Sequence, residues 1–429
     1  MREVAIGLLG VGTVGSGVLR VLHEKEGRIS QALGAQATVR RCLVQDLEKP
    51  RNVPQSKDLF TTDPEAILSD PAIQIVVELM GGEEPARTYM ERALKAGKHV
   101  VTGSKEVISK HGVDLLRIAE QNNVNLFYEA SVGGGIPIIR VLRRDLVVNE
   151  ITHIQAIING TTNYILTDIE QGHTYIEALN QAQALGYAEP DPRNDVEGID
   201  ASYKLAILAS LAFRSTVHPS DIHCTGITKL DLADFRYAKE MGYVIKLIAS
   251  ARLVDGEIEA AVIPTLIPQD HHLASVKGVF NAVLIDGDEI DQLMLYGRGA
   301  GAKPTSSAIL ADVCAAIQDI VTGVAERIEF PAHSRPIRDF GNTVSRFYMR
   351  VLVADEPGVL AKIAHILGEN EISIASCIQK EADDAARAEV AAAGRQPRRD
   401  RLPAWWPPAH VTGPSAPPPR GSSPLCVRR

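Results

Sequence analysis

The sequence predicts an α/β protein in which an N-terminal doubly wound parallel sheet precedes a central α+β domain with a mostly antiparallel sheet. Three patterns support this fold class. A glycine-rich turn follows an apolar strand at the start of the chain, strands and helices alternate as far as residue 129, and Asp-Gly turns join strands within residues 243–296. Alternation favours a parallel sheet covered by helices, whereas tight turns between strands favour antiparallel hairpins.

The composition is that of a globular protein with more than one hydrophobic core. The chain has 429 residues, of which 45% are hydrophobic, and its five cysteines lack the spacing of a disulfide framework or a zinc site. A net charge of -8 disfavours nucleic acid as a partner. The apolar runs are short and the chain begins with a strand, so we expect no membrane span, no secretory signal and a cytoplasmic location.

The first strand leads directly into a dinucleotide-binding fingerprint. Gly10 permits a tight turn, Gly12 lets the backbone approach a pyrophosphate, and Gly15 lets the following helix pack closely on the strand. The N–H groups at the helix start, with Thr13 and Val14, face the phosphates in such a motif. The pattern predicts a Rossmann-type NAD(P)-binding domain over residues 1–150.

The second strand, residues 39–44, follows a lengthened connection and bears on the choice of cofactor. Gln45 and Asp46 lie at its end, and Arg40 and Arg41 lie nearby. An acid there favours the free ribose of NAD and an arginine favours the phosphate of NADP, so both cofactors remain open.

The alternation continues with strands at residues 73–79, 99–102 and 125–129 and helices at residues 89–94 and 113–121. Ligands bind at the carboxyl ends of such strands, where Lys105 stands in a loop. A catalytic lysine and an exposed loop lysine fit this position equally well. The glycines within residues 130–137 fit either a hinge or a turn whose carbonyls hold a monovalent cation.

Residues 151–299 are expected to form a substrate-binding and dimerisation domain. A strand at residues 151–159 and a polar turn precede a helix, and two hairpins follow within residues 243–266 and 279–296. Apolar positions on both faces of these strands predict a homodimer through the sheet. A second glycine-rich segment, residues 297–305, opens a helix that either completes the cofactor domain over about residues 300–325 or follows an ordinary loop.

The densest charge lies at residues 189–204, where five carboxylates and a lysine accompany the start of an apolar helix. Two prolines and Gly198 predict a loop as far as residue 198 and a helix start near Asp200. Asp200 and Lys204 are then neighbours on the first turn. Burial favours loss of a lysine proton and a nearby carboxylate opposes it, so the pair suits proton transfer near neutral pH.

The other carboxylates of this stretch suit a substrate ammonium group, although a solvated helix N-terminus is an equally simple explanation. A calcium loop is excluded, because Arg193 and Val196 stand where a ligand and the obligatory glycine belong.

Five blocks in this order resemble homoserine dehydrogenase over about residues 4–320. They are residues 10–15 (GVGTVG), 102–105 (TGSK), 129–135 (EASVGGG), 159–164 (NGTTNY) and 186–192 (GYAEPDP). The resemblance implies interconversion of homoserine and aspartate 4-semialdehyde with NAD or NADP, on the route to threonine, methionine and isoleucine. A phosphorylating semialdehyde dehydrogenase needs a nucleophilic cysteine, and none lies between Cys42 and Cys224. A nucleotide-binding sensor without turnover would not need Asp200 and Lys204 together.

The resemblance also implies residue roles and a homodimer or homotetramer. Lys204 is similar in position to the catalytic acid and base, with Lys105 and Asp200 as its partners. The remaining implied sites are Glu189 and Asp195 for the amino acid, Glu129, Val132, Gly134 and Ile136 for sodium, and Gly301 and Lys105 for the cofactor.

The C-terminal region, residues 346–384, resembles the first half of an ACT domain, a module built as strand, helix, strand, strand, helix, strand. Its third strand lies between the first and the second. Residues 385–429 contain both tryptophans, no lysine and a run of three prolines, a composition typical of disorder and of a shifted reading frame. We therefore expect no third strand after Asp384, unless a partner subunit supplies it or the tail itself folds unexpectedly. Residues 346–429 are then expected to be poorly ordered. Catalysis should be unimpaired, and threonine should not inhibit it.

Overall fold

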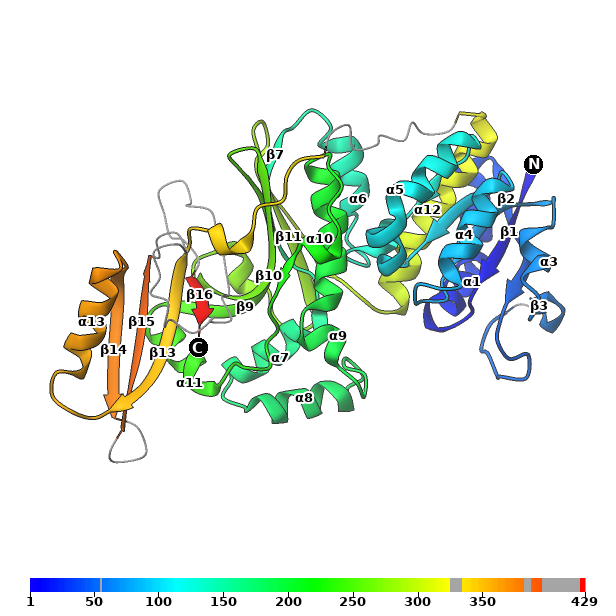
Figure 1. Cartoon of the computed structure of the whole chain (residues 1–429). Helices are drawn as coiled ribbons and strands as arrows, with labels where there is room; N and C mark the ends of the chain where they lie inside the picture. The colour runs from blue at the N-terminus through cyan, green and yellow to red at the C-terminus, as the bar shows by residue number, and fades with distance from the viewer. Residues whose placement is uncertain (55, 325–333, 382–386, 396–424, 429) are drawn as a thin grey trace. The chain divides into compact units, whose positions relative to one another are not determined.

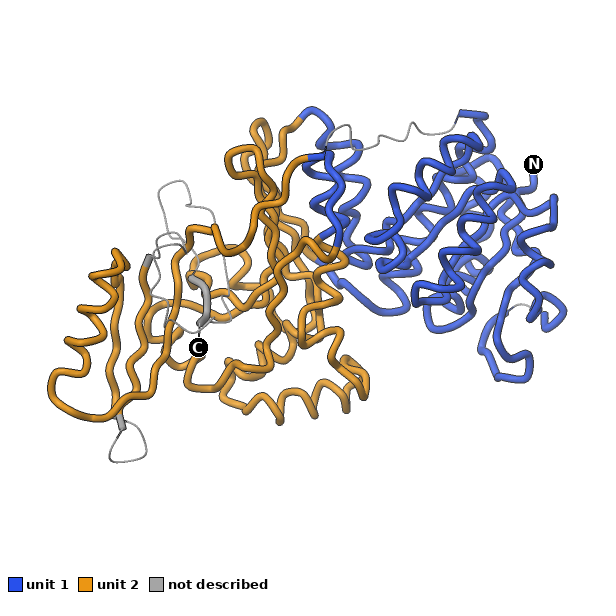
Figure 2. The backbone as a smooth tube through the Cα atoms, in the orientation of Figure 1, with its two compact units in different colours: residues 1–148, 206–218, 297–334 blue, residues 149–205, 219–296, 335–429 orange. Residues whose placement is uncertain are grey.

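The structure, a computed structural model, describes residues 1–54, 56–324, 334–381, 387–395 and 425–428. It comprises two compact units (Figure 2). Unit 1 consists of Met1–Val148, Ala206–His218 and Gly297–Ser334, and unit 2 consists of Asn149–Leu205, Pro219–Tyr296 and Arg335–Arg429.

Unit 1 contains a six-stranded parallel sheet with the order β3-β2-β1-β4-β5-β6 (Figure 1). The strands are β1 Arg2–Leu9, β2 Ala35–Leu43, β3 Phe60–Thr61, β4 Ile73–Glu78, β5 His99–Thr102 and β6 Leu126–Phe127. The order reverses between β1 and β4, and the carboxyl ends of strands at such a switch point bind ligands. The predicted doubly wound sheet is confirmed.

The helices of unit 1 differ from the prediction at two places. They are α1 Thr13–Glu24, α2 Glu26–Leu33, α3 Glu65–Leu68, α4 Ala86–Lys95, α5 Lys105–Gln121, α6 Ile138–Arg140 with the π-helical turn Val141–Asp145, and α12 Ala302–Thr322. Helix α2 fills the lengthened connection before the second strand, and its Ile29 and Leu33, four residues apart, pack half-buried against the core. Helix α5 begins at Lys105, with Ser104 in the N-cap position but without a side-chain capping bond.

Helix α12 joins the N-terminal part of unit 1. The Ser306 hydroxyl donates to the carbonyl of Val14 on α1 at 3.1 Å, and Ile309 and Val313 share a core with β1 and α1. Of the helices that the structure describes, α12 alone has the length and apolar character to cross a membrane. Because α12 packs in the core of unit 1 and contains the buried Asp312, its apolar composition is that of an internal helix.

Unit 2 is built on a mostly antiparallel sheet, as predicted, with the order β12-β11-β7-β9-β10. Its strands are β7 Ile151–Ile157, β9 Tyr243–Val254, β10 Glu257–Pro268, β11 Phe280–Gly287 and β12 Asp291–Arg298, with the short β8 His223–Cys224 parallel to β10. Strands β9 and β10 are buried along most of their length.

The helices of unit 2 are α7 Gly160–Glu170, α8 Tyr175–Ala184, α9 Arg193–Val196, α10 Ile199–Ala212 and α11 Leu232–Glu240. Helix α9 is a single turn within the stretch expected to be a loop, which corrects that prediction. Pro192 precedes the first turn of α9, where a missing N–H costs nothing. Helix α10 begins in unit 2 and ends in unit 1.

The C-terminal region contains the strand that the sequence analysis excluded. Strand β13 Arg346–Ala354, helix α13 Val359–Glu369 and strand β14 Ser373–Glu381 are followed by β15 Arg387–Arg395. Strand β15 lies between β13 and β14 and pairs antiparallel with both. The expectation of no third strand was wrong. Its alanines have weak strand propensity, but a central position satisfies both backbone edges and buries residues 390–393.

A last strand, β16 Leu425–Arg428, pairs antiparallel with β10 and parallel with β13. Ordered strands thus occur at both ends of the segment expected to be a disordered tail. Residues 382–386 and 396–424, to which the same expectation applied, lie outside the described residues.

Candidate active site

Asp200, on the first turn of α10, and Lys204, one turn later, form a largely buried ion pair. Lys204 Nζ lies 2.6 Å from Asp200 Oδ2 and donates a second hydrogen bond, of 2.9 Å, to the carbonyl of Ile158. The side chains are only 12% and 5% exposed. The carbonyl at the end of β7 and the carboxylate together fix the position of the ammonium group, as the predicted pairing requires.

Asn159 connects this pair to a second carboxylate. Its Nδ2 donates to Asp195 Oδ1 at 2.7 Å and to Asp200 Oδ2 at 2.9 Å, while its Oδ1 accepts from the Thr162 N–H at 2.8 Å. Asn159 is therefore both the N-cap of α7 and a bridge between two carboxylates. The sequence pattern assigns it no role beyond a strand end, although asparagine before a helix start is a recognisable N-cap signal.

Among the described residues, no contact joins Glu189 to this cluster. It is exposed, and its backbone carbonyl accepts a hydrogen bond of 3.1 Å from Gln183 Nε2. The neighbouring segment is attached to α7, because Thr161 Oγ1 donates to the Tyr187 carbonyl at 2.6 Å and the rings of Tyr164 and Tyr187 lie 5.2 Å apart. The structure thus brings Asp195, Asp200 and Lys204 together, with Glu189 on a tethered segment nearby in sequence.

The fingerprint glycines of unit 1 have the geometry that a pyrophosphate site needs. Gly10 has a φ of +98°, and a Cβ there would lie 2.8 Å from the Leu79 carbonyl oxygen. A Cβ on Gly15 would lie 2.3 Å from the Gly10 oxygen. Gly12, the N-cap residue of α1, has open space at its Cβ position, where a phosphate can approach the N–H groups of Thr13 and Val14.

Gly301 belongs to the same unit. It precedes α12 with a φ of +116°, and α12 packs against α1 through the hydrogen bond between Ser306 and Val14. A second helix N-terminus is therefore attached to the fingerprint helix. This arrangement agrees with the alternative in which residues 297–305 return the chain to the cofactor domain.

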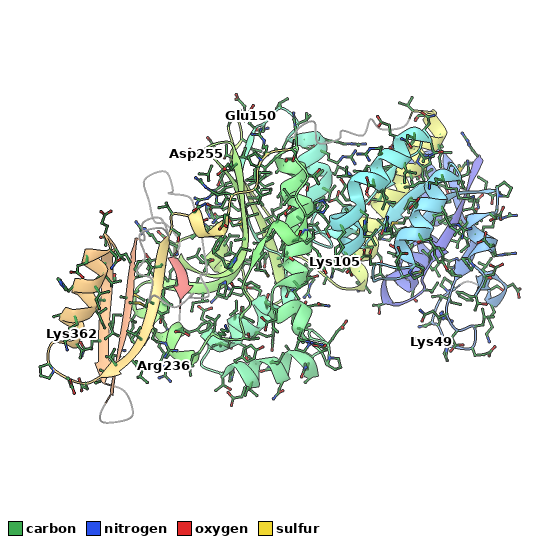
Figure 3. The ribbon with its side chains drawn as sticks, in the orientation of Figure 1. Lys49, Lys105, Glu150, Arg236, Asp255 and Lys362 are labelled. Atoms are coloured by element: carbon green, nitrogen blue, oxygen red, sulfur yellow. The ribbon has the colours of Figure 1, made fainter. Side chains whose placement is uncertain are left out.

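Lys105 is the first residue of α5 and is half-buried (Figure 3), so the prediction of a loop lysine is corrected. A buried network sits directly before it. Thr102 Oγ1 donates to Glu78 Oε2 at 2.6 Å and accepts from the Ser104 N–H at 2.9 Å, which joins the ends of β4 and β5. Burial raises the pKa of the Glu78 carboxyl, and the hydrogen bonds from Thr102 and Met80 oppose that rise. Glu78 is a supporting residue that the sequence analysis missed.

The segment after β2 contains both an acid, Asp46, and an arginine, Arg51. Asp46 has a carboxylate that accepts from the Glu48 N–H, and Arg51 donates to the Asp46 carbonyl at 2.8 Å while its guanidinium lies over the Phe60 ring. Arg40, by contrast, forms an ion pair of 2.7 Å with Asp70. Arg40 lies beside the predicted strand end and was recognised as a candidate. Arg51 was missed, because its position depends on the conformation of the following loop.

The glycine turn after β6 presents carbonyl groups. The Glu129 carboxylate accepts hydrogen bonds of 2.8 Å from the N–H groups of Ile139 and Arg140, so its side chain is already engaged. Gly133 and Gly134 both have positive φ angles, and a Cβ on Gly134 would lie 2.3 Å from the Gly299 oxygen. Within the described residues no cluster of three or more His, Cys, Asp or Glu side chains suits a metal ion.

Two family models match the chain. The homoserine dehydrogenase model matches residues 137–314, and the model of the homoserine dehydrogenase NAD-binding domain matches residues 10–129.

Individual relatives cover most of the chain. It is 46% identical to the homoserine dehydrogenase of Synechocystis sp., over 88% of this chain and 89% of that protein. The crystal structure of a homoserine dehydrogenase from Thiobacillus denitrificans superposes with a TM-score of 0.86 at 38% identity, over 93% of both chains. A hyperthermophilic archaeal homoserine dehydrogenase in complex with NADPH has a TM-score of 0.62 at 28% identity, over 73% of this chain and 98% of that one. The chain therefore belongs to the homoserine dehydrogenase family.

Proposed function

We propose that Lys204 is the general acid and base of this NAD(P)-dependent oxidoreductase, with Asp200 and Asn159 as the groups that position it. The family interconverts homoserine and aspartate 4-semialdehyde. The observation that carries the proposal is the nearly buried Lys204 ammonium, held at 2.6 Å from Asp200 and 2.9 Å from the Ile158 carbonyl. Fixed geometry of this kind is what a proton-transfer group needs.

In the proposed mechanism, protein side chains carry out the proton transfer that accompanies hydride transfer. When bound, the nicotinamide supplies or accepts the hydride. Reduction of the aldehyde leaves an alkoxide, and Lys204 Nζ delivers the proton that neutralises it. In the opposite direction, neutral Lys204 removes the hydroxyl proton of homoserine. Lys105 adds positive charge near the developing oxyanion, which lowers the barrier for the same step.

The carboxylates would hold the amino-acid end of the substrate. Asp195 and Asp200 both accept from Asn159 Nδ2, and Asp200 also pairs with the Lys204 ammonium, so two carboxylates face one lysine. The cluster therefore keeps an excess negative charge that suits the substrate ammonium, as opposite charges attract most strongly where water is partly excluded. Glu189, on its tethered segment, is the second proposed ligand of this group.

The cofactor would bind at unit 1. Gly10, Gly12, Gly15 and the start of α1 would hold the pyrophosphate, and Gly301 and Lys105 would approach the remainder. Asp46 and Arg51 fit the riboses of NAD and NADP respectively, so we propose that both are accepted. The carbonyls of Glu129, Val132, Gly134 and Ile136 would hold a sodium ion.

One assay tests the reaction. NADH and NADPH absorbance is followed with aspartate semialdehyde, homoserine and inorganic phosphate offered in turn. Oxidation of reduced cofactor by the semialdehyde, and its formation with homoserine, are expected. Cofactor reduction that depends on phosphate and semialdehyde would instead indicate the phosphorylating enzyme, and binding without turnover would indicate a sensor.

We further propose a homodimer or homotetramer through residues 151–299. The need to cover apolar faces of the sheet is not an argument for an interface at β9 and β10, because both strands are buried inside unit 2. The edge strand β12 supports an interface instead, because Tyr296 is 54% exposed and residues 293–295 are half-buried. Sedimentation at micromolar concentration should give a multiple of the chain mass, and a monomer would contradict the proposal.

The C-terminal region is proposed to be an ACT-like module with an altered end. Strands β13, β15 and β14 have the order expected for the first three strands. A helical crossover from β15 would leave a fourth strand antiparallel to β13, because crossover-linked strands are parallel. Strand β16 runs parallel to β13 instead. This direction and the lysine-free composition of residues 385–429 support a tail that came from a shifted reading frame.

A further inference from the structure

Unit 1 contains a cavity of about 320 Å³ that the reaction does not use. Its walls are the middle of α5, the π-helical turn after α6, and the last turns of α10 with the following residues 213–218. All lining residues belong to unit 1. The volume is within the range of sites for small organic molecules.

The lining has an apolar body and a positively charged side. Ile108, Leu142 and Leu211 are among the apolar residues, whereas Arg143 and Arg214 contribute guanidinium groups. The other charges are largely matched locally: Lys110 and His111 lie 2.7 Å from Glu83 oxygens, and Arg117 pairs with the Asp114 carboxylate. Arg214, whose guanidinium donates to the neutral Val147 carbonyl, therefore gives the cavity a positively charged wall.

Arg214 has an unusual conformation for its place. It has a φ of +48°, in the left-handed region that glycine adopts freely and other residues adopt at a cost. Its Nη2 donates to the Val147 carbonyl at 2.9 Å, and Val147 also lines the cavity. The bond holds the guanidinium at the wall, and the planar fork of arginine matches a carboxylate. A glycine would spare the backbone cost but would provide no such group.

We propose that this cavity binds a small amphipathic carboxylate, with Arg214 as the anchor, and that its occupancy alters catalysis through α10. The same helix carries Lys204 on its second turn and contributes Ala206, Ile207, Ser210 and Leu211 to the cavity wall. A ligand that shifts the last turns of α10 thus acts on the element that positions Lys204. The effect on catalysis rests on the proposed function, whereas the binding does not.

Binding is tested with 3-phenylpropanoate and the uncharged 3-phenylpropan-1-ol, using calorimetry on the full chain. The carboxylate should bind at least about tenfold more tightly than the alcohol, the scale of one charge-assisted contact. Arg214→Gln should remove that difference and Arg214→Lys should retain part of it. Arg28→Gln, an exposed arginine of α2 outside the cavity, is the matched control and should bind like the wild type.

Two further measurements keep the test decisive. Arg214→Gly relieves the left-handed conformation, so it should melt no lower than the wild type and still lose the preference for the carboxylate. Equal affinity for acid and alcohol, or a preference unchanged by both Arg214 variants, would overturn the site. If the carboxylate changes kcat or KM in the wild type but not in Arg214→Gln, coupling through α10 is supported; binding with unchanged kinetics overturns the coupling. Absence of turnover in untreated wild type counts against the proposed function alone.

Discussion

Asp200 and Lys204 meet on one turn of α10, with Oδ2 and Nζ 2.6 Å apart, and the same Oδ2 also accepts from Asn159. One carboxylate oxygen therefore sets the positions of the proposed acid and of its neighbouring amide. Changing either neighbour should have separable effects on chemistry and on substrate binding.

Lys204→Ala should lower turnover by at least about a hundredfold and leave cofactor binding nearly intact, because a general acid and base is lost while unit 1 is untouched. Steady-state kinetics and NADPH fluorescence titration measure the two quantities. Lys277→Ala is the matched control, since the Lys277 side chain is 60% exposed. Near wild-type turnover in the Lys204 variant would remove this lysine from the mechanism.

Asn159→Ser should separate helix capping from carboxylate bridging. Serine keeps an oxygen for the Thr162 N–H, so the free energy of unfolding should change by less than about 1 kcal/mol. It lacks the Nδ2 donor to Asp195 and Asp200, so kcat/KM should fall about tenfold or more. Asn159→Asp, which caps α7 but adds a third carboxylate, should lose at least as much. Full activity in Asn159→Ser would show that the bridge is dispensable.

Lys246 should make stability rise in alkaline solution. This lysine of β9 is 1% exposed and donates to the Val276 carbonyl at 2.7 Å. Burial lowers its pKa from 10.5 to about 8. Between these values the unfolded chain holds a proton that the folded chain has lost, so stability increases with pH, by about 3 kcal/mol over the interval.

Urea unfolding at pH 7.5 and 10 measures this dependence. Lys246→Met should remove most of the rise, whereas the exposed-site control Lys25→Met should keep it. An equal rise in both variants would assign the dependence to other groups.

Arg350→Met should destabilise the attachment of the C-terminal strands to α11. Arg350 Nε lies 2.7 Å from Asp234 Oδ1 and Nη1 lies 2.9 Å from Glu389 Oε1, and Asp234 is fully buried. Removing the cation takes an ion-pair partner from the buried Asp234 carboxylate, which still accepts from the Tyr348 hydroxyl, at a cost of about 3–5 kcal/mol. Lys362→Met on the exposed face of α13 is the control (Figure 3). Unchanged hydrogen exchange in residues 347–353 of the Arg350 variant would contradict this.

Local sequence signals predicted the parts of the fold that depend on a few adjacent residues. Gly10, Gly12 and Gly15 act within a single turn, and the hairpins follow from Asp-Gly turns. The bridge formed by Asn159 joins residues 36 and 41 positions away, which no local pattern reveals. Strand β15 was missed for a related reason, because its alanines are stabilised by two flanking strands rather than by their own propensity.

The last prediction concerns threonine. Strand β13 has β15 on one side and β16 on the other, so the amides of residues 347–353 should be strongly protected in hydrogen exchange, in contrast to the expectation from composition. Protection alone does not restore an effector site. Strand β16 runs in the opposite direction to the fourth strand of an intact module. A ligand shifts an equilibrium between two states only by its differential affinity for them. Threonine up to millimolar concentration should therefore inhibit turnover by less than about twofold. A threonine titration of the assay, with exchange measured on the same preparation, tests both statements. Sensitive inhibition together with protected β13 amides would show that the altered end still forms a working regulatory module.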